Sequence, residues 1–212
     1  MARRLGIMGG TFDPIHMGHL VAAETARVDV GLDEVVFVPA GDPWQKTDRD
    51  VSPAEQRYLM TVLATAANPA FSVSRLEVDR DGPTYTVDTL RAVRDERPGT
   101  TLFFITGADA ILNILTWKDA EEALQLATFV AATRPGHDLS SLERQGLREH
   151  VTVLDIPALA ISSSDIRARF AADAAVRYLI PDSVEQFARK HALYAAAAAR
   201  PGEHLQEVAV GG

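Results

Sequence analysis

The sequence predicts an α/β fold in which a parallel sheet is covered by helices on both faces. Short, continuous apolar runs, such as residues 5–8, 35–38 and 102–105, alternate with longer amphipathic segments. Apolar runs that are continuous rather than alternating are typical of strands buried on both faces. A repeated strand–helix order favours right-handed crossovers, and therefore a doubly wound parallel sheet.

The strands follow from the apolar runs. We expect strands at residues 5–8, 35–38, 102–105, 128–131 and 151–154. Residues 71–78 are more polar, which indicates either an edge strand or a switch into the next connection. Ligands of such sheets lie beyond the carboxyl ends of the strands, so the segments that follow these runs are the candidates for a site.

The helices are marked by their ends. We expect helices at residues 20–30, 52–68, 86–97 and from 182 onward. The second of these opens on Ser-Pro-Ala-Glu at 52–55, a capping-box pattern with proline at the first helical position. Its expected apolar face consists of Tyr58, Leu59, Val62, Leu63 and Ala66.

Composition limits the class of protein. With 212 residues and 47% apolar content, the chain can form one good-sized core, which we assign to a single domain over residues 1–194. Residues 195–212 combine an alanine run with Pro-Gly and a terminal glycine pair, and this predicts a mobile or weakly helical tail. A net charge of −8 gives no general electrostatic reason to bind a nucleic acid polymer.

Cysteine content and hydropathy limit the possible chemistry and the expected cellular location. The sequence has no cysteine, which excludes disulfides, thiolate catalysis and cysteine metal sites. No apolar run approaches the ~20 residues of a membrane span, and the N-terminus leads into strand residues rather than a signal-peptide core. We therefore expect a cytoplasmic protein without a membrane partner. A homo-oligomer is left open.

The most informative segment joins the first strand to the first helix. Residues 9–19 read Gly-Gly-Thr-Phe-Asp-Pro-Ile-His-Met-Gly-His. Glycines let backbone N–H groups approach an anion closely, and a helix N-terminus favours negative charge. His16 and His19 can add donors to phosphate oxygens. The segment therefore predicts a polyphosphate site.

A second cluster lies far downstream, at residues 161–167, which read Ile-Ser-Ser-Ser-Asp-Ile-Arg. A serine run before a helix is usually an N-cap, and we expect that role here as well. Hydroxyls and backbone N–H groups at a helix start also bind anions, and Arg167, about one turn on, can give a forked contact to phosphate.

Together these two motifs carry a family resemblance. Residues 16–19 have the HxGH form of the nucleotidyltransferase superfamily, and the whole 9–19 string resembles that of the bacterial nicotinate-nucleotide adenylyltransferases. Residues 161–167 resemble the ISSTxxR motif of the same superfamily. The resemblance covers roughly residues 3–194 and implies a Rossmann-like nucleotidyltransferase fold.

The resemblance implies an ATP site. In it, His16 and His19 face the ATP phosphates and stabilise the transition state without a covalent intermediate, and Arg167 is the third catalytic residue. The carboxylate of Asp109 contacts the ribose, which we favour over a role as a lone metal ligand. The implied ATP-binding residues are Gly9, Gly10, Thr11, Phe12, His16, His19, Gly107, Asp109, Ser163, Ser164 and Arg167.

The resemblance also implies a site for nicotinate mononucleotide. Trp117 would stack on the pyridine ring, Thr86 would contact the nicotinate, and Lys46 would contact the phosphate. Thr86 would also cap the helix that follows it. Residues 39–46 depart from the usual bacterial form, which has asparagine and a Pro-His pair, and they place Trp44 in this loop. We expect Trp44 and Lys46 to lie on a mobile loop that closes over the substrate.

The implied reaction is transfer of the adenylyl group of ATP to nicotinate mononucleotide, giving deamido-NAD and pyrophosphate. Mg²⁺ is expected with ATP, held by phosphates and water, and no protein metal site is assigned. The alternatives are nicotinamide mononucleotide as acceptor, a phosphopantetheine adenylyltransferase, and a regulatory module that binds a nucleotide without catalysis. Trp117 with the Thr-Tyr-Thr at 84–86 argues against the second, and intact His16, His19 and Arg167 argue against the third.

Overall fold

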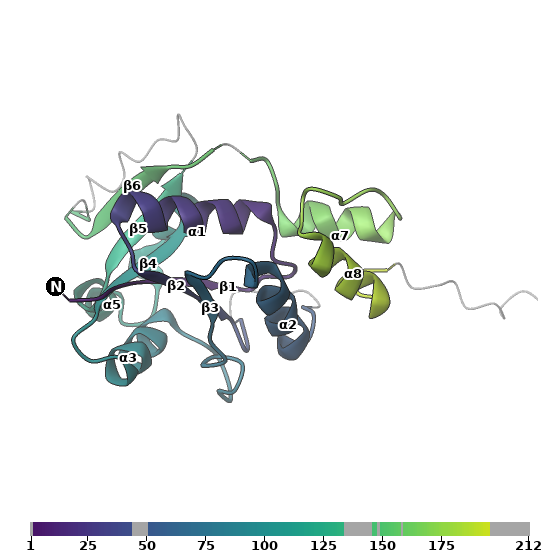
Figure 1. Ribbon diagram of the computed structural model, residues 1–212. Helices are drawn as coiled ribbons and strands as arrows, with labels where there is room; N and C mark the ends of the chain where they lie inside the picture. Colours follow the sequence, from purple (N-terminus) through teal and green to yellow (C-terminus); the bar gives the residue numbers. More distant parts are fainter. Residues whose placement is uncertain (1, 44–50, 134–145, 148, 158, 196–212) are drawn as a thin grey trace, which may run out of the picture.

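The fold was analysed in a computed structural model, which describes residues 2–43, 51–133, 146–147, 149–157 and 159–195 (Figure 1). Trp44, Lys46 and the tail from residue 196 lie outside the described residues, as does the side chain of Asp109. The expectations for a closing loop and a mobile tail therefore stay predictions.

A six-stranded, all-parallel sheet forms the centre of the molecule, in the order β3-β2-β1-β4-β5-β6. This confirms the doubly wound parallel sheet. The strands are β1 (Arg4–Gly10), β2 (Glu34–Pro39), β3 (Phe71–Val73), β4 (Thr101–Gly107), β5 (Thr128–Thr133) and β6 (Val151–Asp155). The polar segment at 71–78 contributes only the short edge strand β3.

The order of the strands creates a switch point between β1 and β4. From β1 the chain moves outward to β2 and β3, then returns to β4, which lies on the other side of β1 and continues to β5 and β6. The connections after β1 and β4 therefore leave on opposite faces, and a crevice opens between them at the carboxyl ends of the strands.

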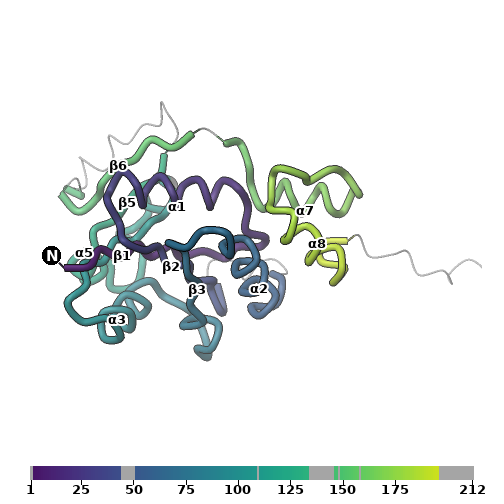
Figure 2. The backbone as a smooth tube through the Cα atoms, viewed as in Figure 1, coloured from purple at the N-terminus to yellow at the C-terminus, as the bar shows by residue number. Residues whose placement is uncertain are grey.

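Helices cover both faces of the sheet (Figures 1 and 2). In this view α1 runs above β1 and β2 and level with β5 and β6, α3 lies below the sheet, α5 lies at its left end, and α7 and α8 extend to the right beside α2. The helical segments are α1 (Met17–Val30), α2 (Ala54–Thr65), α3 (Thr86–Glu96), α4 (Ala108–Ile111), the 3₁₀ turn η2 (Ile114–Thr116), α5 (Ala120–Leu126), α7 (Ser163–Ala171) and α8 (Asp182–Lys190). No described helix is long and apolar enough to cross a membrane.

The sheet separates two hydrophobic cores because successive side chains of a strand point to opposite faces. Leu5, Ile7, Val36 and Phe104 pack with α3 and α5 on one face. Met8, Val35, Phe37 and Ile105 pack with α1 on the other face, and this second core continues into α2, α7 and α8. The continuous apolar runs of the sequence are thus explained by burial on both faces.

Helix α2 differs from the sequence prediction in its start and in its buried face. The helix begins at Ala54, its N-cap residue is Pro53 rather than Ser52, and no side-chain capping bond forms. The Ser52 backbone N–H donates to Asp13 Oδ2 (3.5 Å). The predicted apolar face is wrong, since Leu59 and Leu63 are each 38% exposed. The buried face carries Arg57, Met60, Thr61 and Thr65. The spacing of apolar residues predicted the wrong buried face because Arg57, a polar residue, points inward and bonds to backbone carbonyls.

The segment after β2 lies close to the segment that precedes α3. The backbone of Gly41 touches the Glu77 carbonyl, and Thr84 donates its backbone N–H to Asp42 O (3.2 Å). A methyl group on Gly41 would overlap the Glu77 oxygen, whereas one on Gly107 would meet nothing within 4 Å.

Gly41→Ala should therefore destabilise the protein by about 1–3 kcal/mol, the usual cost of overpacking. Urea denaturation measures the change, and Gly107→Ala serves as the matched control for stability. Equal unfolding midpoints for the two variants would contradict the close approach.

Candidate functional site

Two pockets meet at the switch point. The first, called here the β2-side pocket, has a volume of about 160 Å³ and is lined by Gly9, Gly10, Thr11, Thr86, Trp117 and Lys118, among others. The second, the β5-side pocket, has a volume of about 380 Å³ and is lined by His16, His19, Gly107, Thr133 and Ile156, among others. Thr106 at the end of β4 lines both. The predicted residues that line these pockets are thus brought to one crevice, whereas Phe12, Ser163, Ser164 and Arg167 line neither pocket.

The two histidines form a stacked pair at the start of α1. Their ring centroids lie 3.7 Å apart at an interplanar angle of 24°, and the edge of Phe12 packs against the His19 ring at 5.1 Å. His16 is the N-cap residue of α1, and its backbone N–H donates to Nδ1 of His19 (3.2 Å). Because Nδ1 accepts a hydrogen bond, the proton of a neutral His19 ring lies on Nε2.

His16 is the more buried of the pair, with 7% of the residue exposed. Burial lowers the pKa of His16 to about 4, so the ring is neutral at pH 7. Its Nδ1 atom is buried and has no hydrogen-bond partner among the described residues. This nitrogen lies against the first turn of its own helix, since a Cβ on Gly18 would come within 3.0 Å of it. His16 and His19 are the two members of a capping box at this helix start.

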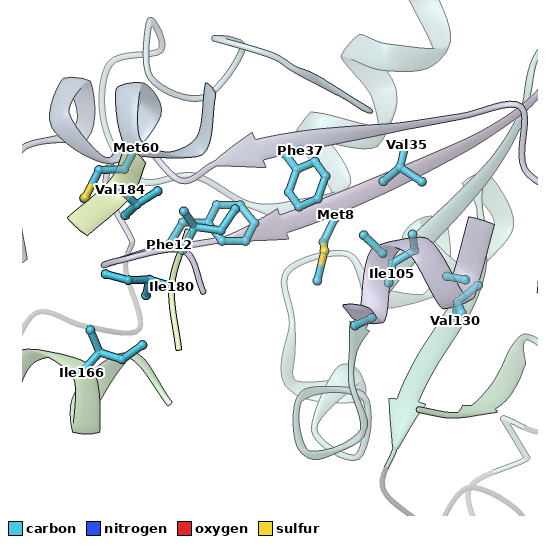
Figure 3. Packing of buried hydrophobic residues seen from close by; sticks show 14 of the residues in the cluster. Met8, Phe12, Val35, Phe37, Met60, Ile105, Val130, Ile166, Ile180 and Val184 are labelled. Atoms are coloured by element: carbon cyan, nitrogen blue, oxygen red, sulfur yellow. The ribbon is translucent and has the colours of Figure 1, made fainter. Parts of the chain in front are cut away.

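The turn between β1 and α1 is held by groups from distant parts of the chain. Arg57 donates to Thr11 O (2.8 Å), Arg167 to Asp13 O (2.7 Å) and Ser163 to Pro14 O (2.9 Å). The Phe12 side chain is buried beside Ile180 and Val184 (Figure 3). Phe12 itself has φ of 49°, a left-handed conformation that costs a non-glycine residue free energy unless its surroundings impose it.

The second motif packs directly against this turn. Ser162 is the N-cap of α7 and accepts from the Asp165 N–H (3.1 Å), which confirms the expected capping role. Arg167 donates to Ser164 Oγ (3.2 Å) as well as to Asp13 O. Ser163, Ser164 and Arg167 therefore hold the turn that carries the histidines. Their contact with phosphate stays a prediction.

Arg57 is a functional candidate that sequence reasoning missed. Its guanidinium is 1% exposed and donates to three backbone carbonyls: Ser52 O (2.8 Å), Thr11 O (2.8 Å) and Gly41 O (2.9 Å). These bonds join the segments after β1 and β2 to the start of α2. Burial lowers the pKa of Arg57, and the charge of the Asp13 carboxylate partly opposes this shift.

The β2-side pocket is lined by aromatic and polar groups. The half-buried Trp117 ring packs edge-on against Phe104 (6.2 Å) and Phe129 (6.3 Å), which leaves it oriented by the core. Thr86 is the first residue of α3, and the N-cap is Tyr85, so the expected capping role for Thr86 is wrong. Burial raises the pKa of Glu77, which accepts from Thr89 Oγ1 (2.5 Å).

Lys118 was also missed. It carries the one positive charge among the described residues that line the β2-side pocket. Its Nζ atom pairs with Asp88 Oδ2 (3.1 Å) and lies 4.6 Å from the centroid of the Tyr85 ring. The signal available in the sequence was its position directly after Trp117.

Residues 7–169 match the family model described as cytidylyltransferase-like. A protein of Leifsonia xyli subsp. xyli is 61% identical over 192 residues, which are 90% of this chain and 94% of that protein. A protein of Streptomyces coelicolor is 59% identical over 189 residues, covering 88% and 98%. Both are named "Probable nicotinate-nucleotide adenylyltransferase".

Solved structures agree on the fold. The Plasmodium falciparum nicotinic acid mononucleotide adenylyltransferase complexed with NaAD is similar, with a TM-score of 0.77 at 22% identity over 91% of this chain and 97% of that one. The same enzyme complexed with APC gives a TM-score of 0.75.

The sheet, the paired histidines and the family match define a nucleotidyltransferase of the cytidylyltransferase-like family. Within this family, relatives with that name are 58% and 61% identical to this chain over 90% of its length. This chain therefore belongs to the nicotinate-nucleotide adenylyltransferases.

The low pKa of His16 makes stability depend on pH. Between its ordinary value of 6.5 and the folded value of about 4, the unfolded state binds a proton that the folded state does not, so stability falls as pH falls through this window. Urea unfolding at pH 7 and pH 4.5 should show that wild type loses about 2–3 kcal/mol more than His16→Gln. His191→Gln, which removes an exposed histidine, should behave as wild type. The same pH dependence in wild type and His16→Gln would show that His16 titrates normally.

Proposed function

We propose that this chain transfers the adenylyl group of ATP to nicotinate mononucleotide, giving deamido-NAD and pyrophosphate, and that it does so in the cytoplasm. The observation that carries the proposal is the meeting of the two pockets at Thr106, beside the histidine pair. A flat aromatic ring at Trp117 suits a pyridine ring in the β2-side pocket. ATP then occupies the β5-side pocket, with its phosphates at the start of α1.

The reaction needs positioning and charge neutralisation more than a general base. The 5′-phosphate of the mononucleotide is already anionic at neutral pH, and it attacks the α-phosphorus of ATP in line. Backbone N–H groups near Gly10 and the ring N–H of His19 are donors for the charge that develops on the α-phosphate. A phosphate beside the neutral His16 ring would raise its pKa and favour the charged form.

We place Ser163, Ser164 and Arg167 at the β- and γ-phosphates. A guanidinium has five N–H donors, and the described bonds of Arg167, to Asp13 O and Ser164 Oγ, leave further donors for a phosphate. Gly107 lines the β5-side pocket beside Ala108, which supports a ribose contact at that strand end. Asp109, whose side chain lies outside the described residues, is assigned to the ribose by family resemblance.

We propose that Mg²⁺ accompanies ATP. Among the described residues, no group of three or more His, Cys, Asp or Glu could hold a metal ion. A cation held by phosphate oxygens and water would neutralise phosphate charge. No protein ligand is assigned to it.

Pyrophosphate release with a panel of acceptors tests the proposal. Purified protein is given ATP and Mg²⁺ with nicotinate mononucleotide, nicotinamide mononucleotide, phosphopantetheine or no acceptor, and products are identified by mass spectrometry. We expect the highest kcat/KM with nicotinate mononucleotide. Preference for another acceptor would replace the substrate, and no turnover with any acceptor would favour a regulatory module.

His19→Ala should lower kcat by about 10²–10³-fold, because it removes a preorganised donor at the reacting phosphate. Initial rates at saturating substrates measure the effect, and far-UV circular dichroism checks that the variant is folded. His191→Ala is the matched control on an exposed histidine. Normal turnover by folded His19→Ala would remove His19 from the mechanism.

Lys118→Met should narrow the preference for the nicotinate over the nicotinamide substrate. The Lys118 charge favours an anionic carboxylate, and losing a half-exposed ionic contact should lower kcat/KM for nicotinate mononucleotide about twofold to fivefold. The value for nicotinamide mononucleotide should stay unchanged. Lys190→Met is the control, and an unchanged ratio in Lys118→Met would assign the discrimination to other groups.

A further inference from the structure

The carboxylate of Asp13 lies at the centre of the β1–α1 turn and is 2% exposed. A buried carboxylate needs hydrogen-bond donors to compensate for the water it has lost. Two are described: the Ser52 backbone N–H, at a long 3.5 Å from Oδ2, and the Tyr194 hydroxyl, at 2.7 Å from Oδ1. The shorter bond therefore comes from a residue 181 positions away in the sequence.

Tyr194 is placed by the C-terminal helices. Its ring packs on Phe170 of α7 (5.6 Å), and its hydroxyl lies 4.0 Å from Met60 Sδ of α2. Ala192 and Tyr194 have φ of 51° and 64°, so the chain after α8 turns in left-handed conformations to bring the ring back. Such a turn costs free energy and is maintained by the contacts that it makes possible.

The hydroxyl acts on the same turn as two other groups. The Asp13 carbonyl accepts from Arg167, and Arg57 donates to Thr11 O in the same turn. The turn then leads, through Pro14 and Ile15, to His16. A change in the position of Asp13 therefore shifts the start of α1, where both histidines lie.

We propose that Tyr194 is a positioning residue for adenylyl transfer: its hydroxyl holds Asp13, and through Asp13 it sets the position of His16 and His19. The inference rests on the proposed function. Burial and the Asp13 charge raise the pKa of Tyr194, which keeps the hydroxyl protonated as a donor at neutral pH.

Tyr194→Phe removes the hydroxyl and keeps the ring. We expect kcat to fall about tenfold to a hundredfold, the range for losing one hydrogen bond to a charged group, with KM for nicotinate mononucleotide nearly unchanged. Tyr178→Phe is the matched control, because Tyr178 is 81% exposed. If Tyr194 only stabilises the fold, Tyr194→Phe lowers the urea midpoint while kcat per folded molecule equals that of Tyr178→Phe, and the proposal is wrong.

Two further measurements make the test specific. In an Asp13→Asn background, Tyr194→Phe should lower kcat by a smaller factor than in wild type, because the charged acceptor is already gone. Nuclear magnetic resonance of the histidine rings without substrates should show shifted His16 and His19 signals in Tyr194→Phe but not in Tyr178→Phe. The two claims fail separately. If wild type makes no dinucleotide in the activity assay, the proposed function is wrong. If the ring signals of Tyr194→Phe are unshifted, the positioning role is wrong.

Discussion

The site depends on one constraint, which is that the turn between β1 and α1 is fixed by hydrogen bonds from remote segments. The turn contains a left-handed Phe12 and a buried Asp13, both of which are unfavourable without partners. Arg57 supplies a bond from α2, and α7 supplies bonds from Ser163 and Arg167. These contacts fix the position of the histidine pair at the end of the turn.

This arrangement gives the C-terminal helices a functional as well as a packing role. They extend the core on the α1 face of the sheet, and Ile180 and Val184 lie near the Phe12 ring (Figure 3). Apolar contacts place the helices, and polar groups on them then bond to the turn. A preorganised turn costs no reorganisation when charge develops on a phosphate, which is the basis of electrostatic catalysis.

Much of the fold and part of the site could be predicted from the sequence. Strands buried on both faces leave continuous apolar runs, and the motifs at residues 9–19 and 161–167 are short, local sequences. The parallel sheet, the Ser162 cap and the placement of the histidines beyond the carboxyl end of the first strand followed from those signals. Arg57 could not be found in this way, since a buried arginine has the same local pattern as a solvated one. Its partners are backbone carbonyls at Thr11, Gly41 and Ser52, and only the folded chain brings these together.

Two errors have the same origin. Ser52 fits a capping box in sequence, yet the N-cap residue is Pro53 and no side-chain capping bond forms. Leu59 and Leu63 fit an apolar face, yet both are partly exposed and Arg57 lies inward instead. Lys118 was missed because its position in the pocket depends on contacts with Asp88 and Tyr85, which lie at the start of α3. In each case a tertiary partner decides what a local pattern cannot.

A crystal structure of the protein with a non-hydrolysable ATP analogue and nicotinate mononucleotide would test the central claim most directly. The account predicts the α-phosphate within hydrogen-bond distance of the His19 ring and the backbone near Gly10, with the turn at residues 11–16 moved by less than ~1 Å from the unliganded position. Phosphates bound away from the histidines, or a turn that rebuilds on binding and breaks its bonds to Arg57 and Arg167, would contradict it.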